Sequence, residues 1–165
     1  MTKLTFGLLA AALLTGDAIA GQSKQGSIQG VWQLVEATIT GPGARTITFP
    51  EPRRNLVIIT ARHYSRVEDQ SEKSRPIVAD VAKASADELR AAWGPFVAEA
   101  GTYELANGNQ LTMRPIAAKN PAVMGAGVFI TYSYKLEGDT VSLTQQRNHT
   151  GPFANPFTLK LVRVE

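Results

Sequence analysis

Short runs of β-forming residues alternate with turn signals from Ile28 to the end of the chain, and this alternation constrains the fold more than any other feature. The runs include Gly30 to Ile39 and a dense apolar run from Asn55 to Thr60. Asn107-Gly108 is a strong turn signal, because both central residues of a type I′ turn need a positive φ. Short strands at such spacing predict an all-β fold, an antiparallel sandwich or barrel of about eight to nine strands.

Hairpins can be predicted at two further places. The run from Asn55 to Thr60 is followed, after a tight connection, by a return strand from Tyr64 to Asp69. The segments VFITYSYKL and TVSLTQQR are joined by the turn residues EGD, and PFTLKLVRV supplies a last strand that closes the chain. Neighbouring strands joined by short turns pair antiparallel, so the pattern predicts an up-and-down arrangement.

Two segments between the strands are expected to differ from them. Ser85 and Glu88 have the spacing of a capping box, in which each side chain satisfies a backbone donor at the start of a helix. Gly94 and Pro95 end the helical pattern. We therefore expect one short amphipathic helix that lies on or caps a barrel end. Its apolar face would consist of Leu89, Ala92, Trp93 and Phe96. The segment from Ala117 to Gly127 is expected to be a long mobile loop.

The first 20 residues have the pattern of a secretory signal. Lys3 precedes an apolar run from Leu4 to Leu14, and small residues at Ala18 and Ala20 suit a signal peptidase. That run is too short for a membrane-spanning helix, which needs about 20 apolar residues. We expect cleavage after Ala20 and a single-domain mature protein from Gly21 to Glu165, periplasmic or secreted and without an integral membrane segment.

Composition excludes several classes of function. There is no cysteine and there are only two histidines, His63 and His149, so neither a structural zinc site nor a three-histidine catalytic site can form. The excess of 17 Lys and Arg over 14 Asp and Glu, a net +3, is too small for a nucleic-acid binder. No phosphate-binding loop, nucleophile elbow or dinucleotide motif occurs. We expect no metal, no cofactor and no nucleic-acid partner.

The strand from Tyr64 to Asp69 carries the first candidate site. Period two places Tyr64, Arg66 and Glu68 on one face. If that face points into a barrel, it suits a ligand carboxylate, or proton transfer from carbon with Glu68 as the base and Tyr64 as a donor to an enolate. The alternative is a solvated outer face with an ordinary Arg66–Glu68 pair, which the usual exposure of charged residues favours.

Aromatic and sulfur-containing side chains supply the other candidates for a ligand-binding wall. Tyr132 and Tyr134 share a face, and a tyrosine suits a pocket because it offers an apolar body with one polar tip. The equal alternative is that the two tyrosines only fill the core. Met113 would add a soft, adaptable wall, and Tyr103 is a further ligand-binding candidate. Arg114 joins Tyr64 and Glu68 as a weak catalytic candidate. His63 in a turn and His149 in a loop at a barrel mouth are expected to be surface residues.

Three features together resemble the lipocalin-like domain family of bacterial and fungal proteins. They are Gly30-Val31-Trp32 in the first strand, AGTYEL after a helix, and KLEGDTVSLT as a late hairpin. The resemblance implies an up-and-down antiparallel barrel with an internal cavity. It also implies a structural role for Trp32, packed across the closed end and covered by an arginine from a late strand. By position that arginine is Arg163, with Arg147 as the second choice.

Three functions remain open on the sequence. The first is an exported binding protein that holds a small, mostly apolar or amphipathic molecule in the barrel. The second is an isomerase, cyclase or lyase that moves a proton in the same cavity, although no recognised catalytic motif is present. The third is an envelope interaction protein whose barrel is filled by side chains, with an exposed apolar patch around Trp93 and Phe96. The sequence favours the first and leaves ligand and oligomeric state undefined.

Overall fold

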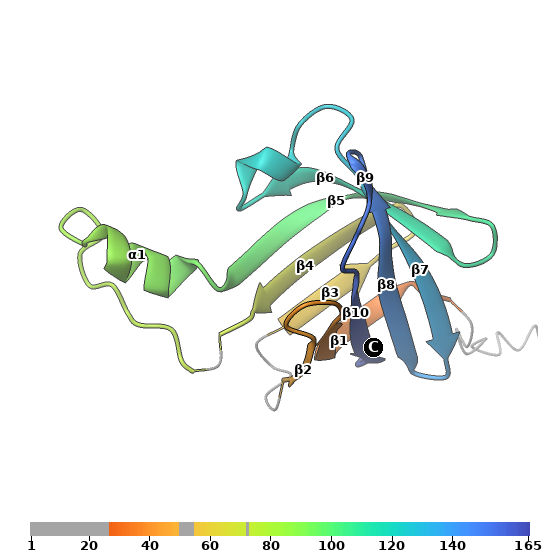
Figure 1. Cartoon of the computed structure of the whole chain (residues 1–165), viewed down its shortest axis with the longest axis horizontal. Coiled ribbons are helices and arrows are strands. Elements are labelled where there is room, and N and C mark those ends of the chain that lie inside the picture. Colours follow the sequence, from red (N-terminus) through yellow and green to blue (C-terminus); the bar gives the residue numbers. More distant parts are fainter. Residues whose placement is uncertain (1–26, 50–54, 72) are drawn as a thin grey trace, which may run out of the picture.

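Ten strands and one helix make up a computed structural model of the chain, which describes residues 27–49, 55–71 and 73–165 (Figure 1). The predicted signal segment lies outside the described residues. The strands are β1 Gly30–Ile39, β2 Arg45–Thr48, β3 Asn55–Ile59, β4 His63–Asp69, β5 Phe96–Ala106, β6 Gln110–Ala118, β7 Ile130–Glu137, β8 Thr140–Asn148, β9 Gly151–Pro152 and β10 Phe157–Arg163.

The strands close into an antiparallel barrel of eight. They follow the order β10-β1-β3-β4-β5-β6-β7-β8, and β8 pairs with β10 to complete the ring. Closure leaves no unpaired edge among the barrel strands, which removes the aggregation risk of an open sheet. The prediction of an all-β antiparallel barrel with one short helix is therefore confirmed, as are the β3–β4 and β7–β8 hairpins.

Several boundaries differ from the sequence-based prediction. β2 and β9 are short additional strands that pair with β1 and β8. β5 begins at Phe96 instead of near Ala100, and β6 continues to Ala118, so the predicted loop loses its first residues to a strand. The 3₁₀ turn η2 at Pro121–Val123 occupies part of the rest. His63 is the first residue of β4, not a turn residue.

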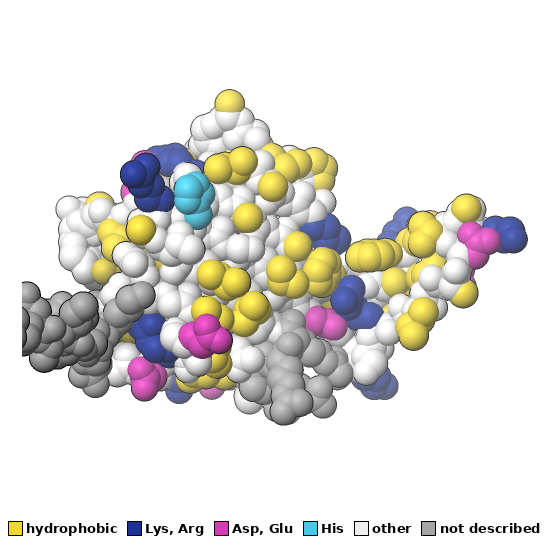
Figure 2. Space-filling view, turned by 180° about the vertical axis from the view of Figure 1, so that it is seen from behind, with side chains coloured by type: hydrophobic (Ala, Val, Ile, Leu, Met, Phe, Trp, Pro, Cys, Tyr) yellow, Lys and Arg dark blue, Asp and Glu magenta, His cyan; other side chains and the backbone are white. Residues whose placement is uncertain are grey.

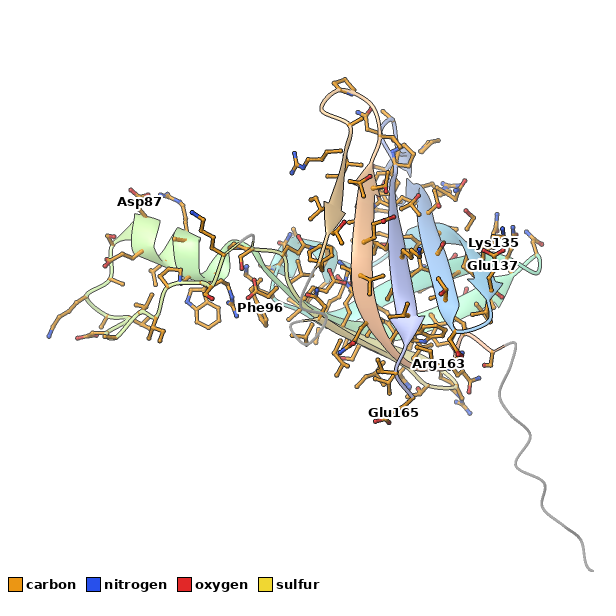
Figure 3. The ribbon with its side chains drawn as sticks, turned by 90° about the horizontal axis from the view of Figure 1, so that it is seen from below. Asp87, Phe96, Lys135, Glu137, Arg163 and Glu165 are labelled. Atoms are coloured by element: carbon orange, nitrogen blue, oxygen red, sulfur yellow. The ribbon has the colours of Figure 1, made fainter. Side chains whose placement is uncertain are left out.

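The helix α1 spans Ala86–Trp93 and begins with the predicted capping box between Ser85 and Glu88. It does not lie on a barrel end. Figures 1 and 3 show that α1 and the segment before it extend away from the barrel as an arm beside the start of β5. The apolar face of the helix meets this preceding segment instead: Ala92 and Trp93 line a hollow of about 280 Å³ with residues 75–78 and 81. Arg75 of that segment holds the arm together, since its guanidinium donates to the Ala92 carbonyl at 3.0 Å and lies 4.7 Å from the Phe96 ring centroid.

Side chains fill the barrel next to the start of β1. Trp32 is completely buried there, with the guanidinium carbon of Arg163 4.1 Å from its ring centroid. The Trp32 indole nitrogen donates to the Ile28 carbonyl at 2.9 Å. Arg163 donates to the carbonyl oxygens of Gln29 and Ser27 at 2.8 and 2.6 Å. The stacked pair thereby fastens the N-terminal segment to the last strand and closes this end of the barrel.

Gly30 is required by the same arrangement. A Cβ at this position would lie 2.2 Å from Arg163 Nη1 and 2.8 Å from the Glu165 carbonyl oxygen, and the backbone has φ +148°. The absence of a side chain at Gly30 therefore leaves the space that the Arg163 guanidinium occupies.

Replacing Gly30 with alanine is expected to lower the free energy of unfolding by about 1–3 kcal/mol, because the backbone is strained and Arg163 is displaced. Chemical denaturation of the wild-type protein and of Gly30→Ala measures the loss of stability. Gly127→Ala is the matched control, because Gly127 also has a positive φ, +83°, but faces open space. Equal losses in the two variants would show that the contact with Arg163 contributes nothing.

Candidate functional site

The inner face of β4 is polar and charged. Tyr64 and Glu68 are 2% and 1% exposed, whereas Val67 between them is 41% exposed. The face with Tyr64, Arg66 and Glu68 therefore points into the barrel, and the alternative of a solvated outer face is wrong. The reason is the pairing of β4 with β3: Tyr64 and Arg66 lie opposite Ile59 and Val57, which belong to the buried core.

Arg66 is the centre of this inner surface. Its Nε atom lies 3.6 Å from Oε1 of Glu68 and 3.5 Å from Oε1 of Glu99, which faces it from β5. The Tyr64 hydroxyl donates to Oε1 of Glu99 at 3.2 Å, and Gln70 Nε2 donates to Oε2 of Glu68 at 3.0 Å. We refer to six inward-facing residues as the interior polar cluster. They are Tyr64, Arg66, Glu68 and Glu99, together with their buried neighbours Asn55 and Tyr132.

Three buried polar atoms of the cluster have no hydrogen-bond partner among the described residues. They are Nδ2 of Asn55, Nε of Arg66 and Oε1 of Glu68. Asn55 and Glu68 are direct partners in the β3–β4 register, and Arg66 is the next inward residue along β4. Asn55 keeps its other polar atom occupied, since its Oδ1 accepts from the Asp69 backbone at 2.9 Å. Arg66 Nε and Glu68 Oε1 lie 3.6 Å from each other, so they form a long ion pair without a hydrogen bond. Buried polar atoms nearly always have hydrogen bonds, so three neighbouring atoms without one mark this surface as a candidate binding site.

Burial also changes the acid–base properties of the cluster. Desolvation raises the pKa of the Tyr64 phenol well above its usual range, and the nearby Glu99 carboxylate adds to the shift, while Arg66 opposes it. Desolvation likewise raises the pKa of Tyr132, against a lowering contribution from Arg66. For Arg66, desolvation is outweighed by Glu68, Tyr132 and Glu99, so its pKa rises and it stays a cation. The two tyrosines are therefore neutral hydrogen-bonding groups at physiological pH.

An alkaline titration tests the raised pKa values of the tyrosines. Tyr64, Tyr103 and Tyr132 have raised pKa values, so in the folded protein their ionisation, followed by absorbance near 295 nm, should begin above about pH 10, the ordinary value. Because the folded chain then holds protons that the unfolded chain has lost, stability should fall as the pH rises above about 10. Ionisation of all four tyrosines near the ordinary value while the protein remains folded would contradict the burial of the cluster.

The other predicted site residues fall in three different places. Met113 is buried and belongs to the core on β6, next to the layer that contains Tyr132. Tyr103 and Tyr134 are partly buried against that core, and the Tyr103 hydroxyl donates to the Thr60 carbonyl at 2.7 Å, which holds the β3–β4 turn. These three residues support the interior without belonging to the polar cluster.

Arg114 lies on the outer face of the barrel. Its side chain is 43% exposed, pairs with Glu104 at 3.7 Å and lies over the Phe129 ring. The suggestion that it converges with Tyr64 and Glu68 is therefore wrong, because it follows Met113 and alternation turns it outward. Arg147 is also exposed and lies over Phe129, far in register from Trp32. His149 occupies the exposed turn between β8 and β9.

Sequence reasoning missed Glu99 and Asn55. Glu99 precedes the segment AGTYEL, where the predicted strand begins. The register that places Glu99 opposite Arg66 cannot be predicted, because the arm separates β4 from β5 in the sequence. Asn55 is the first residue of a run that is otherwise apolar, so the sequence predicts a strand there and no site residue. The available signal was alternation within VAEAG, which sets Glu99 on one face and two alanines on the other.

The outer surface has features of its own. A hollow of about 930 Å³ lies between the β5–β6 turn and the outer side of β7 and β8, and its polar lining includes Ser133, Lys135, Ser142 and Thr144. Figure 2 shows hydrophobic side chains gathered on the outer face of the barrel; Leu56, Ile58 and Val67 of β3 and β4 are 40%, 37% and 41% exposed. The arm adds Ile77, Val81 and Trp93, all at least half exposed. Among the described residues, neither the hollow, the apolar outer face nor the arm contains a buried charged atom without a hydrogen-bond partner.

Across residues 27–49, 55–71 and 73–165, no group of three or more histidine, aspartate or glutamate side chains is arranged to hold a metal ion. Within the same residues, no helix has the length and apolar character needed to cross a membrane.

Comparison with known proteins gives little further information. No protein-family model matches the chain, and no curated protein does either. A solved structure described as a redesigned beta barrel is similar with a TM-score of 0.38 and 11% sequence identity, over 83% of this chain and 91% of that one. The case for a function therefore depends on the barrel and its interior polar cluster.

Proposed function

We propose that this protein is an exported binding protein that holds a small, mostly apolar molecule inside its barrel, in the manner of the lipocalin-like domain family that its sequence resembles. Its support is the export signal expected over residues 1–20, which is typical of periplasmic or secreted proteins. The interior of the closed barrel is mostly apolar, and its buried core includes Val57, Leu111 and Met113. A few polar groups within an apolar lining are the usual composition of a small-molecule site.

One observation carries this proposal: Arg66 Nε and Glu68 Oε1, two buried charged atoms of the interior polar cluster, have no hydrogen bond among the described residues. Burying a charged group costs several kcal/mol unless good geometry and further hydrogen bonds compensate. Here the ion pairs of Arg66 are 3.5 and 3.6 Å long, beyond the usual 2.7–2.9 Å of a charge-assisted hydrogen bond. Apolar residues in place of such a cluster are often neutral or stabilising, so the presence of the cluster supports interaction with a polar group of a ligand.

Native mass spectrometry of the mature protein, purified gently from its own host, tests the proposal. We expect a bound small molecule at close to one per chain, which is displaced when Arg66 is replaced by methionine. Extraction and identification of the molecule follow. A protein that is free of ligand and also binds no probe from a panel of apolar and amphipathic compounds would instead support a filled barrel that acts as an envelope interaction protein.

A second candidate is an enzyme that moves a proton in the same site. The observation in its favour is that Tyr64 and Glu68 lie on the same inner face of β4, connected through Glu99 and Arg66, and that Oε1 of Glu68 has no hydrogen bond among the described residues. Arg114 takes no part, because it is on the outer face. If the co-purified molecule returns chemically altered after incubation, Glu68→Gln should abolish the conversion and retain binding. Conversion at the wild-type rate in that variant excludes Glu68 as the base.

A further inference from the structure

The interior polar cluster has an unequal number of acidic and basic groups. Arg66 faces two carboxyl groups, Glu68 at 3.6 Å and Glu99 at 3.5 Å from the same Nε atom. Both carboxyl groups have second partners on the protein, from Gln70 and Tyr64. The positive charge of Arg66 is therefore already shared between two carboxyl groups, and it is not free for a third one from a ligand.

Three atoms of the cluster have no hydrogen bond among the described residues, although two of them, Arg66 Nε and Glu68 Oε1, face each other in a 3.6 Å ion pair. These atoms define the hydrogen bonds that a ligand would complete. Nδ2 of Asn55 and Nε of Arg66 are donors, and Oε1 of Glu68 is an acceptor. A ligand group that pairs with all three atoms must accept hydrogen bonds from Asn55 Nδ2 and Arg66 Nε and donate one to Glu68 Oε1. A hydroxyl group does so with a single oxygen, and a carboxamide does so with its oxygen and its nitrogen.

We propose that the barrel binds the neutral polar head of an otherwise apolar molecule, an alcohol or a carboxamide, and discriminates against the corresponding carboxylate. This inference rests on the proposed function. The sequence suggests a ligand carboxylate at this face. The structure favours a neutral group instead, because a carboxylate beside Glu68 and Glu99 would be a third negative group around one guanidinium. Such juxtaposition of like charges is a common device of specificity.

Charged alternatives fit the cluster less well. A carboxylate offers only acceptors, so Oε1 of Glu68 would stay unpaired and be repelled. An ammonium group offers only donors, so it would pair with Glu68 but leave Asn55 Nδ2 and Arg66 Nε unpaired, next to a like charge. The apolar body of the ligand would contact the aliphatic residues that flank the cluster in register, Val57 opposite Arg66 and Val97 opposite Glu68.

Three probes of equal chain length test the inference: octanamide, 1-octanol and octanoate, each titrated at pH 7 into ¹⁵N-labelled mature protein. We expect the amide and the alcohol to shift the Arg66 Nε–H and Asn55 Nδ2–H₂ signals, with dissociation constants at least about tenfold lower than that of octanoate. Octanoate binding as tightly as octanamide would overturn the inference while leaving barrel binding intact. If none of the three probes shifts these signals, the proposed function itself fails for ligands of this class.

A charge variant with a matched control sharpens the comparison. Glu99→Gln removes one carboxylate from the cluster, so octanoate should bind at least about threefold more tightly and octanamide should change little. Glu104→Gln is the control, because Glu104 lies on the same strand but is 69% exposed and pairs with Arg114 on the outer face. A preference for the amide that stays the same in Glu99→Gln would contradict the charge argument. The wild-type comparison stands by itself if this variant does not fold.

Discussion

Replacing Trp32 with alanine is expected to lower the free energy of unfolding by about 3–5 kcal/mol, the usual range for deleting a large buried aromatic side chain. The indole is completely buried, and its removal leaves a cavity at the closed end of the barrel. It also deprives Arg163 of the ring over which it lies at 4.1 Å and removes the hydrogen bond to Ile28. For a domain of this size, the melting temperature should fall by roughly 10 °C or more.

The same substitution at Trp93 provides the control. Trp93 is 50% exposed, at the end of α1 on the arm, so Trp93→Ala should cost less than about 1 kcal/mol. Thermal and denaturant unfolding of both variants, followed by circular dichroism, gives the comparison. A loss at Trp93 as large as that at Trp32 would mean that the arm, and not the closed end, holds the folded state together.

The barrel itself could be predicted because its signals are local. Period-two alternation and turns such as Asn107-Gly108 identify strands one at a time, and short connections then pair them with their neighbours. Gly30 and Trp32 are informative for a different reason. Only a residue without a side chain leaves room for Arg163, so the glycine and the tryptophan belong to one packing arrangement.

Features that depend on contacts distant in sequence could not be predicted. The helix face that contains Ala92 and Trp93 indicates an apolar partner but not which one, and the partner is the segment just before the helix. β2 pairs with β1 through residues whose pattern is weak, so nothing in the sequence identified it as a strand. Helix position and extra strands are set by tertiary packing, which one sequence does not reveal.

The candidate site, like the fold, could be predicted only as far as local pattern allowed. Alternation grouped Tyr64, Arg66 and Glu68 correctly, but it could not decide between the inner and the outer face, because Val67 was the only apolar marker. General exposure of charged residues then favoured the wrong face. Glu99 could not be added, because its partnership with Arg66 depends on a register that passes through the arm.

Replacing Arg66 with methionine is expected to have an effect as large as that of the Trp32 variant, for an electrostatic reason. Methionine keeps the length and apolar stem of the side chain but leaves Glu68 and Glu99 buried without their shared cation. Removing one partner of a buried ion pair typically costs about 3–5 kcal/mol. Arg147→Met is the control: Arg147 is exposed on the outer face, so its loss should cost less than about 0.5 kcal/mol.

Neutralising the two carboxylates identifies the origin of that loss. The triple variant R66M/E68Q/E99Q should recover most of the loss at pH 7, because neutral amides cost far less to bury than carboxylates that have lost their cation. Chemical denaturation of the wild-type protein, Arg66→Met and the triple variant measures the recovery. A deficit that persists in the triple variant would mean that Arg66 acts through packing alone, and the electrostatic account of the interior polar cluster would have to be abandoned.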